Sequence, residues 1–186
     1  MTKKKKNSAP WRTCIIGSGV EKAGAFLANP ANFRIHPLDQ QNGLEGILDS
    51  VGWIQNVVMN KRTSPLWEES QNVDTLLDGH LRVSLALSKG EDTEVPVLYV
   101  DLTPDEETLV LTTLDFLTGM AAVDKEKLGE LMRDVHSDDE RIQQLIASIA
   151  EQNGIGTNPD ISDKDERLNI TERFEIVIDC EDEATQ

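Results

Sequence analysis

The 186-residue sequence lacks any apolar run close to the roughly 18 residues that a membrane-spanning helix needs. Its basic start, Lys3 to Lys6, also lacks the apolar stretch of a signal peptide. The two cysteines, Cys14 and Cys180, lie outside any CxxC or Cys/His cluster, which disfavours a disulfide scaffold and a zinc module. These absences predict a protein of the reducing cytoplasm with no membrane partner.

Three common catalytic signatures are also missing. The sequence contains no GxxxxGKS, no GxSxG and no HExxH element. The phosphate loop of P-loop NTPases, the nucleophile elbow of α/β hydrolases and the zinc helix of zincins are therefore unsupported.

Positive charge is scarce, and it is unevenly placed. The formal net charge is -16, yet residues 1–90 hold 11 basic and 8 acidic side chains, whereas residues 91–186 hold 7 and 26. An anion-binding surface is therefore expected in the first half. The acidic second half also leaves open a scaffold or DNA-mimic role.

The chain divides into four predicted parts. Residues 1–11 form a basic disordered tail, which either contacts a polyanion or is merely solvated. Residues 12–135 form the main domain, and 136–153 an amphipathic helix that needs a partner surface. Residues 154–186 read as an acidic linker and a strand at 174–178, which would join the sheet, pair with another chain, or belong to a longer protein.

Local patterns predict alternating strands and helices in the main domain. Expected strands cover 53–59, 73–77 and 95–100, and Pro96 places at least the first part of the last strand near an edge. Expected helices cover 44–51, 80–89, 104–117 and 124–135, with a further helix after the capping pattern at 137–140. Residues 29–37 carry two prolines and are expected to form an ordered loop.

The segment from Thr75 to Arg82 is the most informative for function. It places a turn and a helix start directly after an apolar strand, and a helix N-terminus offers unpaired N–H groups and partial positive charge to phosphate. Gly79 permits close approach of a ligand, and Arg82 can hold two phosphate oxygens. The segment predicts an open, electropositive pocket. The structural alternative is that Asp78 caps the helix, Gly79 turns the chain and Arg82 lies on the surface.

Four segments in order resemble the ParB-like N-terminal domain of the ParB/sulfiredoxin superfamily. The match covers about residues 12–135 and extends through 113–116 and 123–131, which resemble ParB-like domains found beside DNA methyltransferases in phages and mobile elements. The four segments are NPANFRIHP (29–37), LEGILDSVGWIQ (44–55), LDGHLRVSLA (77–86) and VPVLYVDLT (95–103).

The resemblance implies an α+β fold, in which a small mixed sheet with flanking helices is followed by a helical extension and the C-terminal acidic strand segment. It places Gly79, His80 and Arg82 on a phosphate-binding GxxR turn, and Trp53 and Gln55 in the family's first conserved box. His80 stands where sulfiredoxins hold their reactive cysteine, so repair of sulfinic acid is not expected. The acidic residues of 124–152 disfavour the DNA-reading helices of chromosome-partitioning members.

The candidate site residues fall into two groups. Glu45, Asp115 and His80 are the catalytic candidates of a nuclease or nucleotide hydrolase, with Glu45 and Asp115 as ligands of Mg²⁺. A helix N-terminus disfavours imidazolium, so His80 is expected to be neutral. The acidic residues could equally be a cap or solvated positions. The phosphate- or nucleotide-binding candidates are Asp78, Gly79, His80, Arg82, Arg34, His36 and Gln55.

Two classes of function follow from the resemblance and stay open at this point. One is a ParB-like domain in DNA metabolism that binds nucleic acid or a nucleotide, CTP or ATP with Mg²⁺, with or without nuclease activity. The other is a non-catalytic interaction module whose partner is a DNA methyltransferase or a second copy in a homodimer. Fold alone does not choose between them.

Overall fold

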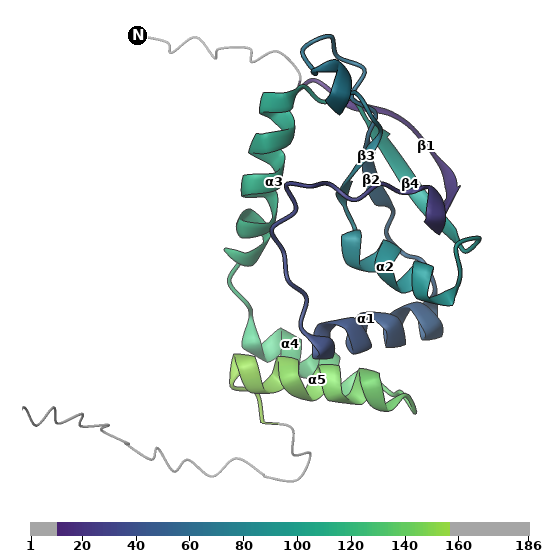
Figure 1. The fold of residues 1–186 in the computed structure, drawn as a ribbon. Coiled ribbons are helices and arrows are strands. Elements are labelled where there is room, and N and C mark those ends of the chain that lie inside the picture. The colour runs from purple at the N-terminus through teal and green to yellow at the C-terminus, as the bar shows by residue number, and fades with distance from the viewer. Residues whose placement is uncertain (1–10, 157–186) are drawn as a thin grey trace, which may run out of the picture. The chain divides into compact units, whose positions relative to one another are not determined.

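The computed structural model describes residues 11–156, which lie within the first of two units of the chain, 1–156 and 157–186. The lysines of the predicted basic tail and the strand predicted at 174–178 lie outside the described residues. Figure 1 shows a sheet beside helix α3 (Pro104–Gly119), with helices α1 (Leu38–Val51), α4 (Lys125–Asp134) and α5 (Glu140–Asn153) gathered together. No helix within residues 11–156 is long and apolar enough to cross a membrane.

The sheet has four strands in the order β1-β4-β2-β3. Strand β4 pairs antiparallel with β1 and parallel with β2, and β2 pairs antiparallel with β3, so the sheet is mixed. The strands are β1 (Ile15–Lys22), β2 (Val57–Asn60), β3 (Thr75–Asp78) and β4 (Glu94–Val100). The predicted α+β class, a small mixed sheet with flanking helices, is confirmed.

Alternation along the strands sends apolar side chains to both faces of the sheet. On one face, Val57, Leu76 and Val97 are buried with Val83 and Ala86 of helix α2 (His80–Lys89). On the other face, a smaller cluster of buried residues packs with side chains of helix α3 (Pro104–Gly119). These residues are Leu77, Val100 and Leu102, with Val110 and Leu111 from α3.

Most helix boundaries follow the capping signals in the sequence, but α1 begins at Leu38, directly after Pro37, and not at the expected residue 44. Thr103 caps α3 in a complete capping box with Glu106, and Pro104 is the first helical residue. Gly52 ends α1 (Leu38–Val51) with φ of 84°, and Asp124 caps α4 (Lys125–Asp134). Helix α5 (Glu140–Asn153) is capped by Asp139 rather than by Ser137, the first residue of the predicted capping pattern.

The partner surface of α5 is helix α1. Gly43 and Gly46 are buried in α1, and a Cβ at Gly43 would lie 3.1 Å from Leu145 while one at Gly46 would lie 3.1 Å from Ile142. The two glycines therefore let α5 approach closely. Arg141 adds ion pairs to Asp49 and Glu45 of α1.

Strand β1 has no clear signal in the sequence, because Gly17, Ser18 and Gly19 interrupt its apolar pattern. The structure gives the reason: Tyr99 of the neighbouring strand lies against these glycines, and a Cβ at Gly19 would be 3.1 Å from its hydroxyl. Strand β4 is an inner strand, but its pairing with β2 begins at Val97. Its first residues, including Pro96, therefore pair with β1 only, as the proline suggests.

Strand β2 begins at Val57 rather than at the predicted Trp53. Trp53 instead packs against the core on the α2 face from the connection after α1. Gln55 and Asn56 accept hydrogen bonds from Arg82. The residues between α1 and β2 therefore serve the pocket described next.

Candidate phosphate pocket

A pocket of about 490 Å³ lies where α3 passes the end of β3 and the start of α2. Its polar side chains come from the loop before α1, the connection before β2, the β3–α2 turn and α3. Its apolar side chains come from the sheet and from α3. The lining residues are Arg34, Gln55, Val58, Leu77, Asp78, Arg82, Val110, Leu111, Leu114, Asp115 and Thr118.

The β3–α2 turn is built around Gly79. Its φ is 94°, in the left-handed region that favours glycine, and it is the N-cap of α2 without a side-chain cap. A Cβ here would lie 2.7 Å from Val57 Cγ1 and 3.1 Å from Arg82 Nη2. Gly79 therefore makes room for the core and for the arginine, whereas the sequence suggests room for a ligand.

Arg82 lies in the first turn of α2, and its side chain is only 14% exposed. Nη1 donates to Gln55 Oε1 at 2.7 Å, and Nη2 donates to Asp78 Oδ2 at 2.9 Å. Nε is fully buried and has no acceptor among the described residues. Asp78 is thus a partner of Arg82 and not a helix cap, which removes one of the structural alternatives.

Arg34 brings the loop of residues 29–37 to the same pocket. Its guanidinium forms an ion pair with Asp115 of α3 and lies 3.6 Å from Asp78 Oδ1. Next to it, the rings of Phe33 and Phe116 stack at 6.2 Å with an interplanar angle of 7°. The loop and the second half of α3 are therefore joined by one ion pair and one aromatic contact.

The charges of the pocket are balanced. Two guanidiniums, Arg34 and Arg82, face two carboxylates, Asp78 and Asp115, in an alternating series of three ion pairs. The sequence predicts an electropositive pocket in which Arg82 is free. The structure differs because Asp78, at the end of β3, lies four residues before Arg82 and pairs with it. The carboxylates are 44% and 45% exposed, so both have room to move.

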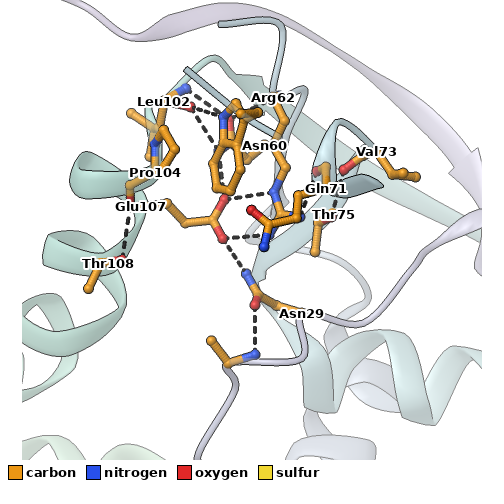
Figure 2. A network of polar contacts seen from close by, with 12 residues as sticks. Asn29, Asn60, Arg62, Gln71, Val73, Thr75, Leu102, Pro104, Glu107 and Thr108 are labelled. Atoms are coloured by element: carbon orange, nitrogen blue, oxygen red, sulfur yellow. Dashed lines mark hydrogen bonds and ion pairs between the residues drawn. The ribbon is translucent and has the colours of Figure 1, made fainter. Parts of the chain in front are cut away.

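A buried polar network fixes the first half of α3 and the start of the loop (Figure 2). The Glu107 carboxylate accepts hydrogen bonds from Asn29 Nδ2 at 2.8 Å and from Asn60 Nδ2 at 2.7 Å. Arg62 adds a two-pronged contact, with Nε and Nη2 at 3.1 and 2.7 Å from the two carboxylate oxygens. Because Asn29 begins the loop, this network helps to set the position of Arg34.

The hydrogen bonds of this network keep the buried Glu107 carboxylate ionised. Burial by itself would raise the pKa of Glu107, but hydrogen bonds from Arg62, Asn60 and Asn29 outweigh it and hold the pKa below its ordinary value. Arg62 also stacks over the Trp67 ring at 4.3 Å and adopts a left-handed φ of 47°. Such strain in a non-glycine residue persists only where surrounding contacts hold it.

The two histidine candidates lie beside the pocket but do not line it. His80 Nε2 accepts a hydrogen bond from the Asn29 backbone N–H at 3.1 Å, which requires an unprotonated nitrogen. Burial lowers the pKa of His80, and the positive charge of Arg34 adds to this against the opposing effect of Asp78. His36 contacts Gln40 through Nδ1 at 3.0 Å. Both therefore position the loop, and His80 is expected to be neutral near pH 7.

Glu45 lies away from Asp115. It belongs to a different, smaller pocket with Trp53 and Lys89, and it forms ion pairs with Lys89 and Arg141. Within residues 11–156, no three side chains of His, Cys, Asp or Glu are grouped so as to hold a metal ion. The predicted pairing of Glu45 with Asp115 as Mg²⁺ ligands thus does not fit the residues described, and we derive no step through a protein-held metal.

The structure brings together five of the sequence candidates: Arg34, Gln55, Asp78, Arg82 and Asp115. Sequence reasoning missed the buried network of Asn29, Asn60, Arg62 and Glu107. A weak signal exists for Glu107, which falls one residue after the capping glutamate of α3 among three consecutive acids. No signal in the sequence pairs it with Arg62, 45 residues away.

No protein-family model matches the chain, and no curated protein matches it. Several solved structures are similar to it, and two of them are described here. One is the C-terminally truncated chromosome-partitioning protein ParB from Caulobacter crescentus complexed with CTP-γ-S, with 16% identity and a TM-score of 0.49 over 75% of this chain and 72% of that one. The other is a Pnob8-like ParB-N domain, with 20% identity and a TM-score of 0.40, and the match covers 74% of this chain and 49% of that one. These similarities concern the fold alone.

Proposed function

We propose that the pocket at the β3–α2 turn binds the phosphate groups of a nucleotide, CTP or ATP with Mg²⁺, or of nucleic acid, in a protein of DNA metabolism. The observation that carries the proposal is the side chain of Arg82. Its side chain is 14% exposed, it lines the pocket, and its buried Nε has no acceptor within residues 11–156.

A buried donor without an acceptor costs about 1–3 kcal/mol, and native proteins seldom leave one so. Because Nε has no exposed surface, a phosphate oxygen would supply the acceptor once a neighbouring side chain, Gln55 or Asp78, moves aside. The guanidinium is already held in place by Gln55 and by the Asn56 carbonyl at 3.4 Å, so little side-chain freedom is lost when an anion binds. Unpaired N–H groups of the first turn of α2 lie at the same end of the helix.

The shape of the pocket suits a ligand with a charged end and an apolar body. Its volume of about 490 Å³ falls within the range of small-molecule sites. Its lining combines apolar side chains, namely Val58, Leu77, Leu111 and Leu114, with the two guanidiniums of Arg34 and Arg82. A nucleotide has this combination, with a flat base and a phosphate chain, and the ParB-like sequence segments favour CTP and ATP as the first ligands to test.

The test is the binding of CTP, ATP and a short DNA duplex, each with Mg²⁺, to the parent chain and to Arg82→Gln by isothermal titration calorimetry. We expect Arg82→Gln to weaken binding by about tenfold or more, since a charge-assisted contact of 1.5–3 kcal/mol is lost. Arg133→Gln, an exposed arginine of α4, is the matched control. Thermal melting of each variant establishes that it is folded. Equal affinity of Arg82→Gln and the parent would remove the pocket from consideration.

Catalysis is a separate question that the same samples answer. Nuclease or nucleotide-hydrolase activity would appear as release of labelled product with Mg²⁺, above the level of Arg82→Gln. Binding without turnover would assign the chain to the non-catalytic class. Binding is the activity that the pocket contacts support directly.

One observation favours the second candidate function, a protein-interaction module. Helix α3 and its C-cap residue Met120 expose five large apolar side chains: Leu109, Leu114, Phe116, Leu117 and Met120. Exposed apolar surface of this kind is typical of a protein interface. A DNA methyltransferase and a second copy of this chain are the partners to test, by light scattering of the chain alone and mixed with the methyltransferase. We expect Leu117→Ser to abolish any complex while leaving CTP and ATP binding in place.

A further inference from the structure

The Asp115 side chain holds a special place among the charges of the phosphate pocket. The four charged groups form a series in which Arg82 pairs with Asp78, Asp78 faces Arg34, and Arg34 pairs with Asp115. Asp115 is the terminal member, and it alone comes from α3. Its side chain is 45% exposed, while that of Arg34 is 24% exposed.

A carboxylate and a phosphate make the same demand on a guanidinium. Both present two oxygens that match its planar fork, and a phosphate carries more charge. Asp115 therefore engages on Arg34 a group that an incoming phosphate would also use. With Asp115 in place the formal charge of the pocket is zero, and with Asp115 turned away it is +1.

We propose that Asp115 is a built-in competitor of the ligand: its carboxylate occupies Arg34 until a phosphate replaces it there. This proposal rests on the proposed function, because it assigns a regulatory group to the same pocket. The Asp115 carboxylate makes the pocket neutral before a ligand binds. Only a ligand whose anionic group is a stronger partner for Arg34 than a carboxylate can replace it.

The exchange has a mechanical consequence for α3. The first half of the helix is fixed through Glu107, which is buried among Asn29, Asn60 and Arg62. The second half is joined to the loop by the Asp115–Arg34 ion pair and by the Phe33–Phe116 stack. When phosphate takes Arg34, one of these two contacts is lost, so ligand binding loosens residues 111–119 while residues 104–110 stay in place.

The experiment measures binding of inorganic pyrophosphate by calorimetry to four proteins. These are the parent, Asp115→Asn, Arg34→Gln and Asp105→Asn. Asp105 lies on the same helix and is exposed, so it controls for the loss of one negative charge. We expect Asp115→Asn to bind about three- to tenfold more tightly than the parent, since a partly exposed ion pair no longer competes. Arg34→Gln should bind more weakly than the parent, and Asp105→Asn should stay within about twofold of it.

Hydrogen exchange supplies a second readout. Asp115→Asn and Arg34→Gln break the same ion pair, so both should speed amide exchange in residues 111–119 while they shift affinity in opposite directions. Pyrophosphate added to the parent should speed exchange in the same residues, a measurement that needs no variant. A purely structural ion pair would instead make both variants alter affinity in the same direction.

The outcomes separate this inference from the proposed function. If Arg82→Gln weakens binding of CTP, ATP or DNA but Asp115→Asn binds pyrophosphate no more tightly than Asp105→Asn, Asp115 is not a competitor, and the phosphate pocket stands. If Arg82→Gln binds as tightly as the parent, the proposed function itself is lost. Absence of pyrophosphate binding in both the parent and Asp115→Asn overturns the inference, whereas the proposed function is judged by the binding of CTP, ATP and DNA.

Discussion

Two of the arginine–carboxylate pairs that involve helix α3 differ in almost every physical respect. Glu107 and Arg62 are 5% and 8% exposed, and three donor side chains surround the carboxylate. Asp115 lies two turns farther along α3 and pairs with Arg34 of the loop. Both side chains are partly exposed, and Arg34 also faces a second carboxylate, Asp78. The same two chemical groups therefore make a fixed anchor at one point of the helix and an exchangeable contact at another.

The difference shows which arginine contacts point to function. A buried pair with every donor and acceptor satisfied is costly to break, because removal of one partner leaves an uncompensated charge. A half-exposed pair contributes little to stability, because water screens it. Ligand exchange is therefore feasible at Arg34 and Arg82, and it is not feasible at Arg62.

The largest expected effect contrasts the two carboxylates directly. Glu107→Gln should reduce the free energy of unfolding by about 3–5 kcal/mol, since Arg62 would remain buried without its counter-charge. Asp115→Asn should reduce it by less than about 1 kcal/mol. Urea denaturation at pH 7 measures both values.

The pH dependence of Glu107→Gln provides an independent check of the anchor. The pKa of Glu107 is lowered in the folded protein, so its ionised form adds stability above its ordinary value of 4.5, and that stability is lost as pH falls through the folded-state pKa. The stability difference between parent and Glu107→Gln should therefore shrink in acid. Equal losses for Glu107→Gln and Asp115→Asn at pH 7 would contradict the distinction between the two pairs.

The next largest effect concerns Gly79 in the β3–α2 turn beside the pocket. Gly79→Ala should destabilise the protein by about 2–4 kcal/mol, because a left-handed residue gains a Cβ that also meets Val57. Gly154→Ala is the matched control: Gly154 is also left-handed, at φ 64°, but its Cβ would meet only Lys125 Nζ at 3.6 Å. Urea denaturation of the two variants separates backbone strain from the clash. A similar loss in both would mean that Val57 can move aside.

A smaller effect concerns His80, which accepts a hydrogen bond from Asn29, the residue that links the Glu107 network to the loop of residues 29–37. Burial lowers the pKa of His80, so the folded state disfavours its protonation. The stability it contributes is present above the ordinary value near 6.5 and is lost as pH falls below it. His80→Asn should flatten the change in melting temperature between about pH 7 and 5. Titration of the imidazole by NMR should give a midpoint below that of an exposed histidine; a midpoint at or above it would contradict the burial.

The smallest expected effect is the response to salt. Raising the salt concentration from about 0.05 to 0.5 M should speed hydrogen exchange in residues 111–119, because screening weakens the partly exposed pair of Asp115. Residues 104–110, next to the buried Glu107, should respond much less. A uniform response along α3 would indicate that its two halves are held equally.

Much of the fold could be read from local signals, because those signals act over a few residues. The capping box at Thr103, the glycine ends of α1 and α2 and the order of elements from α1 to α4 follow the sequence closely. Strand β1 could not be read, since its glycines are explained only by the ring of Tyr99 on the adjacent strand. Arg34, Gln55 and Arg82 could be named as candidates from the resemblance of their segments to a known family.

The sequence by itself determined where the capped helices begin, where α1 and α2 end, and which segment forms the strand–turn–helix unit around Gly79, because caps, turns and apolar periodicity are local properties. Only the tertiary structure decided which carboxylate meets which arginine. Asp115 and Glu107 are two acids on one helix, and no local property separates them. Packing places one in a buried network and leaves the other half in water, and that difference in environment sets their expected roles.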